Sequence, residues 1–395
     1  MKRITGFILL ALWTSLSAVA QETEDAFEKF RSQSNADFDA FSEAVTRQWD
    51  EYEKASKEAF ENFKKGIELK WGATNFKEST PKDWVEYSDD QMTRTVVDFE
   101  TGEASIELLL SPGEAANAEL VRKKMSDAVK DLSTTRGKSK DFSMDFEQPM
   151  PLSDQPVLKN QLVTEEGKPV TETNINEYAS EVVEKKTIEK KPVTGADEQK
   201  RVVVSVKLPL APNSIQTRAE KFYEPIRIFA ARYDLDPELV FAIMHTESYF
   251  NPKARSHVPA FGLMQIVPRY AGRDAYKFVH GEDRLLNENY LYEAEKNIEL
   301  GAAYLHILLV RNFGRVNDPL SRLYCSIAAY NTGAGNVSRA FIGSTKLGEA
   351  IPKINQMNSN QVYEHLRAYL PYQETKDYIE KVAKRMNSYR EWMSD

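Results

Sequence analysis

An aromatic repeat in residues 22–71 constrains most strongly how the first part of this chain can fold. Pairs of aromatic residues three positions apart recur every eleven residues: Phe27/Phe30, Phe38/Phe41, Trp49/Tyr52 and Phe60/Phe63, followed by Trp71. Eleven residues make three turns at about 3.67 residues per turn, so the rings form one stripe along a long, nearly straight helix. We expect this helix over residues 21–71. Its aromatic face is expected to pack on its own protein or a second copy, with a partner protein or a membrane as the alternative; the acidic polar face argues against anionic lipid.

The first twenty residues have the pattern of a secretory signal peptide. Lys2 and Arg3 precede an apolar run from Ile4 to Trp13, and Ala18-Val19-Ala20 forms a small-residue cleavage site. The run is shorter than the roughly 20 apolar residues that span a bilayer. We therefore expect residues 1–20 to be removed on export, with an uncleaved anchor as the alternative.

Composition and charge limit the classes of protein further. A chain of 395 residues with 41% hydrophobic residues can form two or three domains. Its single cysteine, Cys325, excludes an intramolecular disulfide and lies in an apolar run. Residues 211–395 carry 23 Lys and Arg against 21 Asp and Glu, whereas the whole chain has a net charge of −8. This uneven distribution favours an acidic ligand for the C-terminal part.

The remainder of the chain divides into two regions by pattern. Residues 72–213 mix strand and helix signals: 93–110 alternates around a turn at Thr101-Gly102, Ser111 begins a capping box, 184–200 is a loop or hairpin tip, and 201–210 is a strand. Residues 214–395 are helical in pattern, with helices expected near 217–232, 236–249, 294–311, 321–330 and 373–392. The predicted fold class is therefore α+β: a long amphipathic helix, a small α+β domain and a mainly helical domain.

Glu247 is the residue whose position calls for a chemical explanation. It ends a helix expected to begin at Asp236, and it continues the apolar face of Leu239, Ile243 and Met244. An apolar setting disfavours the carboxylate and raises the pKa above its ordinary value of about 4.3. A carboxyl that keeps its proton near neutral pH can act as a general acid. The alternative is a solvated or ion-paired glutamate.

Three further groups of residues follow Glu247. Five basic residues lie between positions 253 and 277: Lys253, Arg255, Arg269, Arg273 and Lys277. Within that stretch, Gln265 of Gly262-Leu263-Met264-Gln265 lies in an apolar setting and requires hydrogen-bond partners. Tyr330 and Asn331 come at a helix end before Gly333. Aromatic rings, amides and a protonated acid are the groups that a sugar-binding site uses.

The order and spacing of these motifs resemble those of the family 1 lytic transglycosylases. Glu247-Ser248, Gly262–Gln265, Ala329-Tyr330-Asn331 and the late Tyr378 match the four motifs of that family, and Asn297–Leu305 resembles the helix before the third motif. Residues 84–107 are similar to the N-terminal domain of the membrane-bound lytic murein transglycosylase C family. The resemblance extends over about residues 72–392.

The resemblance implies a lysozyme-like domain in residues 214–395 that cleaves the MurNAc–GlcNAc β-1,4 bond of peptidoglycan glycan strands. It implies that Glu247 protonates the glycosidic oxygen and then takes a proton from the C6 hydroxyl of the same MurNAc, which closes a 1,6-anhydro ring. The implied saccharide-binding residues are Ser248, Met264, Gln265, Tyr330, Asn331 and Tyr378. One carboxyl suffices because the nucleophile belongs to the substrate, whereas ordinary glycoside hydrolysis needs two.

The sequence departs from the membrane-bound relatives at Val19, which stands where a lipoprotein signal has its cysteine. We therefore expect an unlipidated periplasmic enzyme. The five histidines form no zinc-binding pattern, and Gly333-x-Gly335 follows a helix, so we expect no metal, cofactor or nucleic acid. Two alternatives stay open: a lysozyme-type hydrolase that uses Glu247 with water, and a non-catalytic peptidoglycan-binding scaffold.

Overall fold

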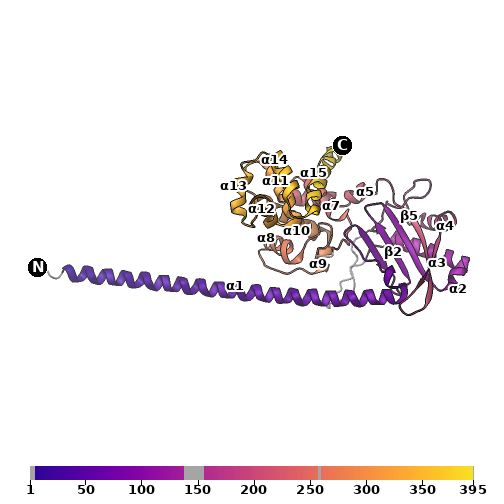
Figure 1. The fold of residues 1–395 in the computed structure, drawn as a ribbon, viewed down its shortest axis with the longest axis horizontal. Coiled ribbons are helices and arrows are strands. Elements are labelled where there is room, and N and C mark those ends of the chain that lie inside the picture. The colour runs from indigo at the N-terminus through magenta and orange to yellow at the C-terminus, as the bar shows by residue number, and fades with distance from the viewer. Residues whose placement is uncertain (1–4, 138–154, 257–258, 395) are drawn as a thin grey trace. The chain divides into compact units, whose positions relative to one another are not determined.

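The computed structural model describes residues 5–137, 155–256 and 259–394 (Figure 1). By its internal contacts the chain divides into two units, Met1–Glu58 and Ala59–Asp395. The helix α1 (Thr5–Trp71) begins in the first unit and ends in the second. The boundaries expected at residues 20, 71 and 213 stay predictions.

The long N-terminal helix predicted from the aromatic repeat is present as α1, which also continues through the residues assigned to the signal peptide. Within the first unit, the rings of Trp49 and Tyr52 lie 5.6 Å apart and the Trp49 indole donates a hydrogen bond to Glu53. The side chains of the first two aromatic pairs lie outside the described residues. In the described part of the chain, every helix falls short of the combined length and apolarity of a membrane-crossing segment.

The end of the aromatic stripe, which belongs to the second unit, forms part of a core. Ile67 and Trp71 are fully buried. Phe63 and Trp71 each make an edge contact with Tyr87, at centroid distances of 5.8 and 6.0 Å. The last turns of α1 therefore pack on the chain's own sheet. What the rest of the stripe contacts stays a prediction.

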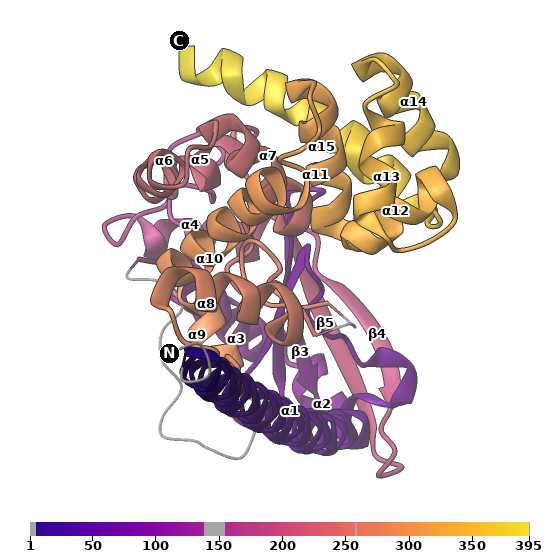
Figure 2. The ribbon, with the colours of Figure 1, turned by 90° about the vertical axis from the view of Figure 1, so that its left-hand side faces the viewer.

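A five-stranded antiparallel sheet has the strand order β1-β2-β3-β5-β4. Its strands are β1 (Asp83–Tyr87), β2 (Thr93–Asp98), β3 (Glu103–Leu110), β4 (Glu189–Thr194) and β5 (Lys200–Pro209), and Figure 2 shows β3, β5 and β4 side by side. The predicted 93–110 hairpin is confirmed, with Gly102 at φ +70° in its turn. The predicted strand at 201–210 is also confirmed.

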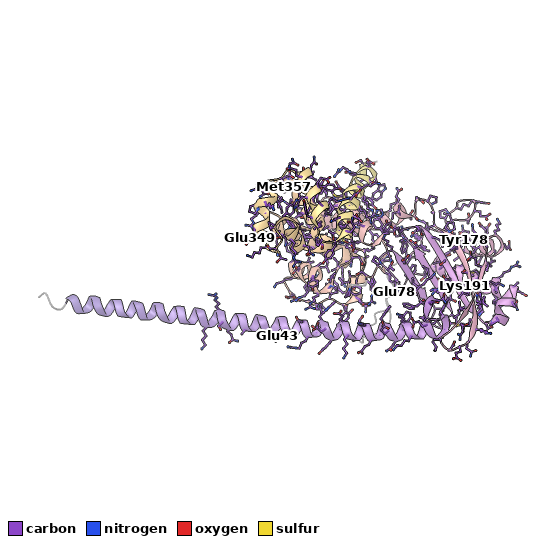
Figure 3. The ribbon with its side chains drawn as sticks, in the orientation of Figure 1. Glu43, Glu78, Tyr178, Lys191, Glu349 and Met357 are labelled. Atoms are coloured by element: carbon purple, nitrogen blue, oxygen red, sulfur yellow. The ribbon has the colours of Figure 1, made fainter. Side chains whose placement is uncertain are left out.

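The charged segment 184–200 forms more than a loop. It contains β4, which pairs with β5 across a tip at residues 195–199. β4 is an edge strand whose Lys190, Lys191 and Pro192 are exposed (Lys191 is labelled in Figure 3). An edge strand tolerates charges and proline because one side of its backbone faces no neighbouring strand. Because most of its side chains are exposed and three are charged, β4 lacks the alternation of apolar and polar residues that indicates a strand.

One face of the sheet is covered by helices. They are α2 (Pro112–Ala116), α3 (Ala118–Thr134) and α4 (Ile175–Lys185), and α2 begins with the predicted capping box of Ser111 and Glu114. Met125 and Val129 of α3 and Tyr178 of α4 (labelled in Figure 3) share a buried cluster with Ile106 of β3. This cluster is the core of the α+β domain.

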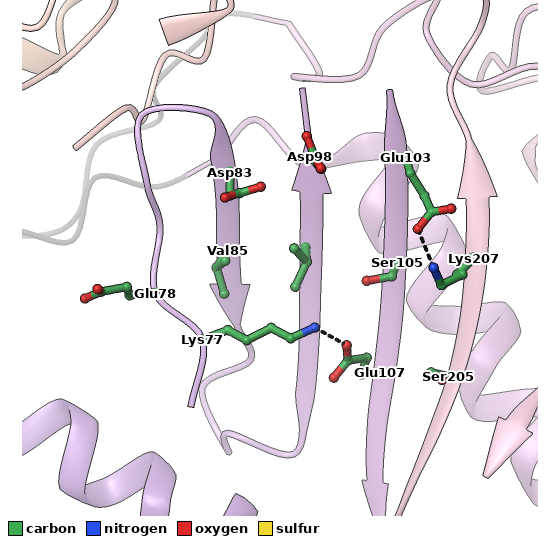
Figure 4. A pocket seen from close by; sticks show the side chains of 11 residues that line it. Lys77, Glu78, Asp83, Val85, Asp98, Glu103, Ser105, Glu107, Ser205 and Lys207 are labelled. Carbon is green, nitrogen blue, oxygen red and sulfur yellow. Dashed lines mark hydrogen bonds and ion pairs between the residues drawn. The ribbon is translucent and has the colours of Figure 1, made fainter. Parts of the chain in front are cut away.

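The opposite face of the sheet is only partly covered by the end of α1. Beside it lies a cavity of about 420 Å³, lined mainly by charged side chains (Figure 4). Two of its lysines pair with its acids: Lys77 with Glu107 at 2.8 Å and Lys207 with Glu103 at 2.7 Å. We call this cavity the charged groove.

The C-terminal region is helical. Its α-helices are α5 (Ser214–Glu220), α6 (Tyr223–Arg232), α7 (Pro237–Ser248), α8 (Arg273–His280), α9 (Glu288–Tyr292), α10 (Ala294–His306), α11 (Pro319–Thr332), α12 (Ala334–Ile342), α13 (Leu347–Ile354), α14 (Ser359–Tyr369) and α15 (Gln373–Ser394). Two short π-helices, η2 (Pro268–Gly272) and η3 (Ile307–Asn312), lie among them. A 3-10 helix, η1 (Ala73–Asn75), precedes the sheet in the other region. All five predicted helices are present, the first of them divided into α5 and α6. The predicted α+β fold class is confirmed.

The helix α7 differs from its predicted pattern. Its residues from Leu239 to Met244 are all buried, including Phe241 and Ala242, so α7 is surrounded by neighbours rather than apolar on one face. It contacts α15 most extensively and also α6. Asp236 lies at the predicted N-cap position, but its side chain makes no capping hydrogen bond. A surrounded helix places its last turn, which carries Glu247, at the edge of the core.

Candidate active site

Glu247 lies in the last turn of α7, where its side chain is half-buried. Its Oε1 accepts a hydrogen bond of 2.6 Å from the hydroxyl of Tyr378 on α15. Burial raises the pKa of Glu247 to about 8, while the Tyr378 bond opposes this shift and the charge of Glu374 adds to it. The carboxyl is therefore mostly protonated at neutral pH, in a position that solvent still reaches.

Two tyrosines, Tyr378 and Tyr330, lie close enough to Glu247 for its charge to alter their pKa values. Burial and the carboxyl of Glu247 raise the pKa of Tyr378 and of Tyr330 well above the ordinary value. Both hydroxyls thus keep their protons and act as donors. Tyr378 donates to Glu247, and Tyr330 donates to the main-chain carbonyl of Met264 at 2.9 Å.

The loop containing Gly262 and Met264 is held by a buried asparagine. Asn297 Oδ1 accepts from the Met264 amide at 2.7 Å, and its Nδ2 donates to the carbonyls of Phe261 and Leu291 at 2.8 and 2.7 Å. Gly262 has φ +74°, and a Cβ there would lie 2.4 Å from the Leu291 carbonyl oxygen. Only glycine fits this close approach. Asn297 therefore sets the conformation of the loop.

Gln265 is the polar side chain of this loop with unused hydrogen-bonding capacity. It is 9% exposed and has φ 49°. Its Nε2 donates to the Gly262 carbonyl at 2.9 Å, but its buried Oε1 has no partner among the described residues. An unsatisfied buried acceptor costs free energy. A ligand N–H or O–H group can satisfy it.

Two of the candidate residues face the protein interior. Ser248 is fully buried, with Oγ 2.7 Å from the Leu263 carbonyl oxygen and 3.0 Å from that of Met244. Met264 is fully buried against Gly301, where an added Cβ would lie 2.3 Å from the Met264 sulfur. In this structure they join the loop to α7 and α10.

Two models of protein families match the chain. The transglycosylase SLT domain matches residues 224–351, and the N-terminal domain of membrane-bound lytic murein transglycosylase C matches residues 46–221. Membrane-bound lytic murein transglycosylase C of Edwardsiella ictaluri is 36% identical over 332 residues, which is 83% of this chain and 88% of the relative. The same protein of Actinobacillus succinogenes is 32% identical, covering 83% and 87%. This chain belongs to the lytic murein transglycosylase C family.

Members of the lytic murein transglycosylase C family act on peptidoglycan, and this chain is a lytic transglycosylase. Among solved structures, an inactive variant of the lytic transglycosylase Slt from Pseudomonas aeruginosa is 26% identical, with a TM-score of 0.34 over 43% of this chain and 24% of that one. The complex of the 70-kDa soluble lytic transglycosylase with bulgecin A is 26% identical, with a TM-score of 0.36 over 46% and 26%.

Asn331 is bonded to the helix that carries Tyr378. Its Oδ1 accepts a 2.6 Å hydrogen bond from Thr375, which is buried one turn before Tyr378 on α15. Thr375 and Asn297 are site residues that the sequence did not single out. The available signal for Asn297 was its place directly before the apolar positions of a helical pattern, Ile298 and Leu300, because an amide buried there requires partners.

Two of the five basic residues of 253–277 are paired with acids. Arg273 makes two hydrogen bonds of 2.7 Å to Asp283. Arg255 lies 3.6 Å from the carboxyl of Glu288, and its guanidinium lies 5.6 Å from the ring centre of Phe261. These two pairs reduce the expected attraction for a carboxylate-bearing ligand. No group of three or more His, Cys, Asp or Glu in the described ranges could hold a metal ion.

Proposed function

We propose that Glu247 is the catalytic acid and base of this lytic transglycosylase and that the reaction leaves 1,6-anhydroMurNAc ends. The observation that carries the proposal is the Glu247 carboxyl itself, half-buried, bonded to one neutral donor and with its pKa raised to about 8. A carboxyl in that state holds a proton at neutral pH and can transfer it to the glycosidic oxygen.

The same carboxyl then serves as the base. When the bond between C1 of MurNAc and the GlcNAc oxygen breaks, the oxygen leaves with the proton of Glu247. The carboxylate that remains is stabilised by the 2.6 Å hydrogen bond from Tyr378, because a charged acceptor strengthens such a bond. The C6 hydroxyl of MurNAc then attacks C1 and gives its proton to Glu247, so the enzyme returns to its initial state and no water is consumed.

The other candidate residues have different proposed roles. Gln265 Oε1 is proposed to accept a hydrogen bond from a saccharide hydroxyl or N-acetyl N–H, because it has no partner among the described residues. Tyr330 and Asn331, both half-buried, are proposed to contact the sugar beside Glu247. Ser248 and Met264 are proposed to act by holding the loop that carries Gln265.

The proposal is tested by digestion of purified sacculi with wild type and Glu247→Gln, followed by mass spectrometry of the muropeptides. We expect anhydro ends from wild type and a loss of rate of about 10³-fold in the variant, the usual contribution of a positioned acid–base group. Glu295→Gln, at an exposed position on α10, is the matched control and should keep full activity. Reducing ends from wild type would indicate hydrolysis, and undiminished activity of Glu247→Gln would reject its role.

The relatives are named membrane-bound lytic murein transglycosylases, and murein lies in the cell envelope, so this enzyme is envelope-associated. We propose that residues 1–20 are cleaved on export and that the mature enzyme is periplasmic without a lipid, because Val19 replaces the expected cysteine. Fractionation of cells together with N-terminal sequencing of the mature protein tests this. A mature protein that begins at Met1 or carries a lipid would contradict it.

We also propose that the aromatic stripe before residue 59 mediates contact with a second copy of the chain. Support comes from the sequence spacing, since the three aromatic pairs before residue 59 recur every eleven residues, a period that puts them on one face of a helix. Light scattering on residues 21–395 and on a Phe38→Ser/Phe41→Ser variant provides the test. We expect an oligomer that dissociates in the variant, and a wild-type monomer would contradict the proposal.

A further inference from the structure

The helix that carries Glu247 ends in an uncommon way. Tyr249 and Phe250, directly after Ser248, both have left-handed backbone conformations, with φ 51° and 62°. Such a conformation costs free energy for a residue with a Cβ, and two consecutive bulky residues persist in it only when their surroundings hold them. The contacts of these residues therefore show what fixes the end of α7.

Tyr249 is held at its main chain and at its hydroxyl. Its carbonyl oxygen accepts a 3.0 Å hydrogen bond from Arg218 Nε. Its hydroxyl donates to Glu100 at 2.9 Å and accepts from Arg385 at 2.8 Å. Glu100 belongs to the β2–β3 turn of the α+β domain, whereas Arg385 lies on α15, the helix that carries Tyr378.

Arg218, on α5, connects the α+β domain to the end of α7 through a single buried side chain. It is 2% exposed, and its remaining groups donate to the Phe99 carbonyl and to Gln161 Oε1, both at 2.9 Å. Its guanidinium also lies 4.8 Å from the ring centre of Phe99. All three hydrogen-bond acceptors are neutral. A buried cation without a carboxylate partner is an expensive way to gain stability, so its value lies in the positions that it fixes.

Asn251, two positions after Tyr249, also contacts the α+β domain. Asn251 is fully buried, and its Nδ2 lies 3.4 and 3.3 Å from the carbonyl oxygens of Thr80 and Pro81. Phe250 between them packs in parallel against Phe222, with 6.3 Å between ring centres. Residues 249 to 251 are thus held in succession, only two positions after Glu247.

We propose that the α+β domain positions the Glu247 carboxyl against Tyr378, and that Arg218 and Tyr249 are the positioning residues. The last turn of a helix frays unless its cap is fixed, and a movement of Glu247 alters its 2.6 Å bond to Tyr378. This inference rests on the proposed role of Glu247. It assigns the domain a part in catalysis that does not require contact with the glycan.

Two substitutions test the proposal at different strengths. Tyr249→Phe keeps the ring and removes only the hydroxyl bonds to Glu100 and Arg385. Arg218→Lys keeps the positive charge and removes the fork that reaches three acceptors. Arg227→Lys, an exposed arginine on α6 paired with Glu224, is the matched control.

The measurements are kcat and KM on soluble glycan strands, the pH profile of kcat and the thermal midpoint. We expect kcat to fall about tenfold in Tyr249→Phe and about 10²-fold in Arg218→Lys, because small displacements at a reacting centre have effects of this size. KM should stay within about twofold, since the saccharide contacts remain. The basic limb of the profile should move to lower pH, because a displaced carboxyl is better hydrated. Arg227→Lys should match wild type.

If Arg218 and Tyr249 act only on stability, the variants should have lower thermal midpoints. At temperatures below those midpoints, their kcat and the basic limb of the pH profile of kcat should equal those of wild type. That result would overturn the proposal. If Arg218→Lys does not fold, Tyr249→Phe decides, because it adds no atoms and opens no interior space. Glu247→Gln, assayed in the same experiment, distinguishes failure of the proposed function from failure of the positioning inference. Activity in Glu247→Gln rejects the proposed function, whereas an inactive Glu247→Gln with wild-type kinetics in Tyr249→Phe rejects only the positioning inference.

Discussion

Glu107 in the charged groove and Glu247 at the end of α7 are both glutamates withdrawn from solvent, yet their acidities have shifted in opposite directions. Glu107 is 8% exposed; burial acts to raise its pKa, but Arg94 and Lys77 outweigh burial and leave the pKa below its usual range. Burial also acts on Glu247, but its direct partner is the neutral Tyr378, and its pKa rises to about 8. The partner, rather than burial, decides whether a buried carboxyl becomes the anion of an ion pair or keeps its proton near neutral pH.

The two carboxyls therefore make opposite contributions to stability as pH changes. The lowered pKa of Glu107 gives stability that is present above the unfolded value of 4.5 and is lost as pH falls through the folded value. The raised pKa of Glu247 gives the reverse: its contribution is fully present below 4.5 and is lost as pH rises toward 8. A carboxyl whose pKa is raised in this way is thus a source of instability as the pH approaches 8.

The largest expected effect comes from removing the cation beside Glu107. Arg94 is 3% exposed and bonds to Glu107, to the Tyr87 hydroxyl and to the Asn75 carbonyl. Arg94→Met leaves a buried carboxylate with only Lys77, and we expect the unfolding free energy to fall by about 3–5 kcal/mol at pH 7. Chemical denaturation measures this.

Arg122→Met, at an exposed position on α3, controls for the loss of an arginine and should change stability by less than about 0.5 kcal/mol. The comparison predicts that the difference in unfolding free energy between wild type and Arg94→Met becomes smaller below pH 4.5, where protonation of Glu107 removes the unpaired charge. A deficit independent of pH would show that packing, not charge, holds this pair.

The second expected effect is a gain in stability rather than a loss. Glu247→Gln removes a carboxyl that is costly to ionise, so the variant should be more stable than wild type by about 2 kcal/mol at pH 8, less than the full linkage value because solvent reaches the group. The gain should disappear at pH 4, where wild type is protonated in both states. Thermal melts from pH 4 to 9 test this, and a variant less stable than wild type at pH 8 would contradict the raised pKa.

The third effect concerns Tyr378, the hydrogen-bond partner of Glu247 among the described residues. Tyr378→Phe removes the hydrogen bond that opposes the raised pKa, so the basic limb of the activity profile should move to higher pH. It also removes the donor that stabilises the carboxylate, and kcat should fall about tenfold, which corresponds to about 1.4 kcal/mol. Tyr363→Phe, at a half-buried position on α14, is the control. A limb that moves to lower pH would mean that Tyr378 does not favour the carboxylate.

Residue spacing located Glu247 and the order of family motifs indicated Tyr378, but no sequence signal indicated the partners of Arg218. The reason is the range over which each signal acts. The spacing of apolar residues along α7 is a local signal, and it located the carboxyl at the edge of the core. Tyr378 bonds to Glu247 across 131 positions, and only the order of family motifs indicated it. Arg218 joins residues 31, 57 and 119 positions away, and no spacing in the chain indicates those partners.

The same distinction explains which elements were predicted. The long helices α7, α10, α11 and α15 carry enough turns for their pattern to be recognised. The helices α8, α9, α12 and α13 have nine residues or fewer and depend on tertiary packing rather than on their own propensity. The eleven-residue α14, despite its capping box, was also missed.

The smallest expected effect completes the comparison inside the charged groove. Lys207 and Glu103 form a 2.7 Å ion pair there, as Lys77 and Glu107 do, but their side chains are 65% and 44% exposed. Water solvates both charges, so removing one leaves nothing buried and unpaired, and Lys207→Ala should leave the denaturation midpoint unchanged. Denaturation of Lys207→Ala beside Arg94→Met measures the contrast. A midpoint lowered as far as that of Arg94→Met would show that this part of the groove is less hydrated than its exposure indicates, and that exposure is a poor guide to the value of its ion pairs.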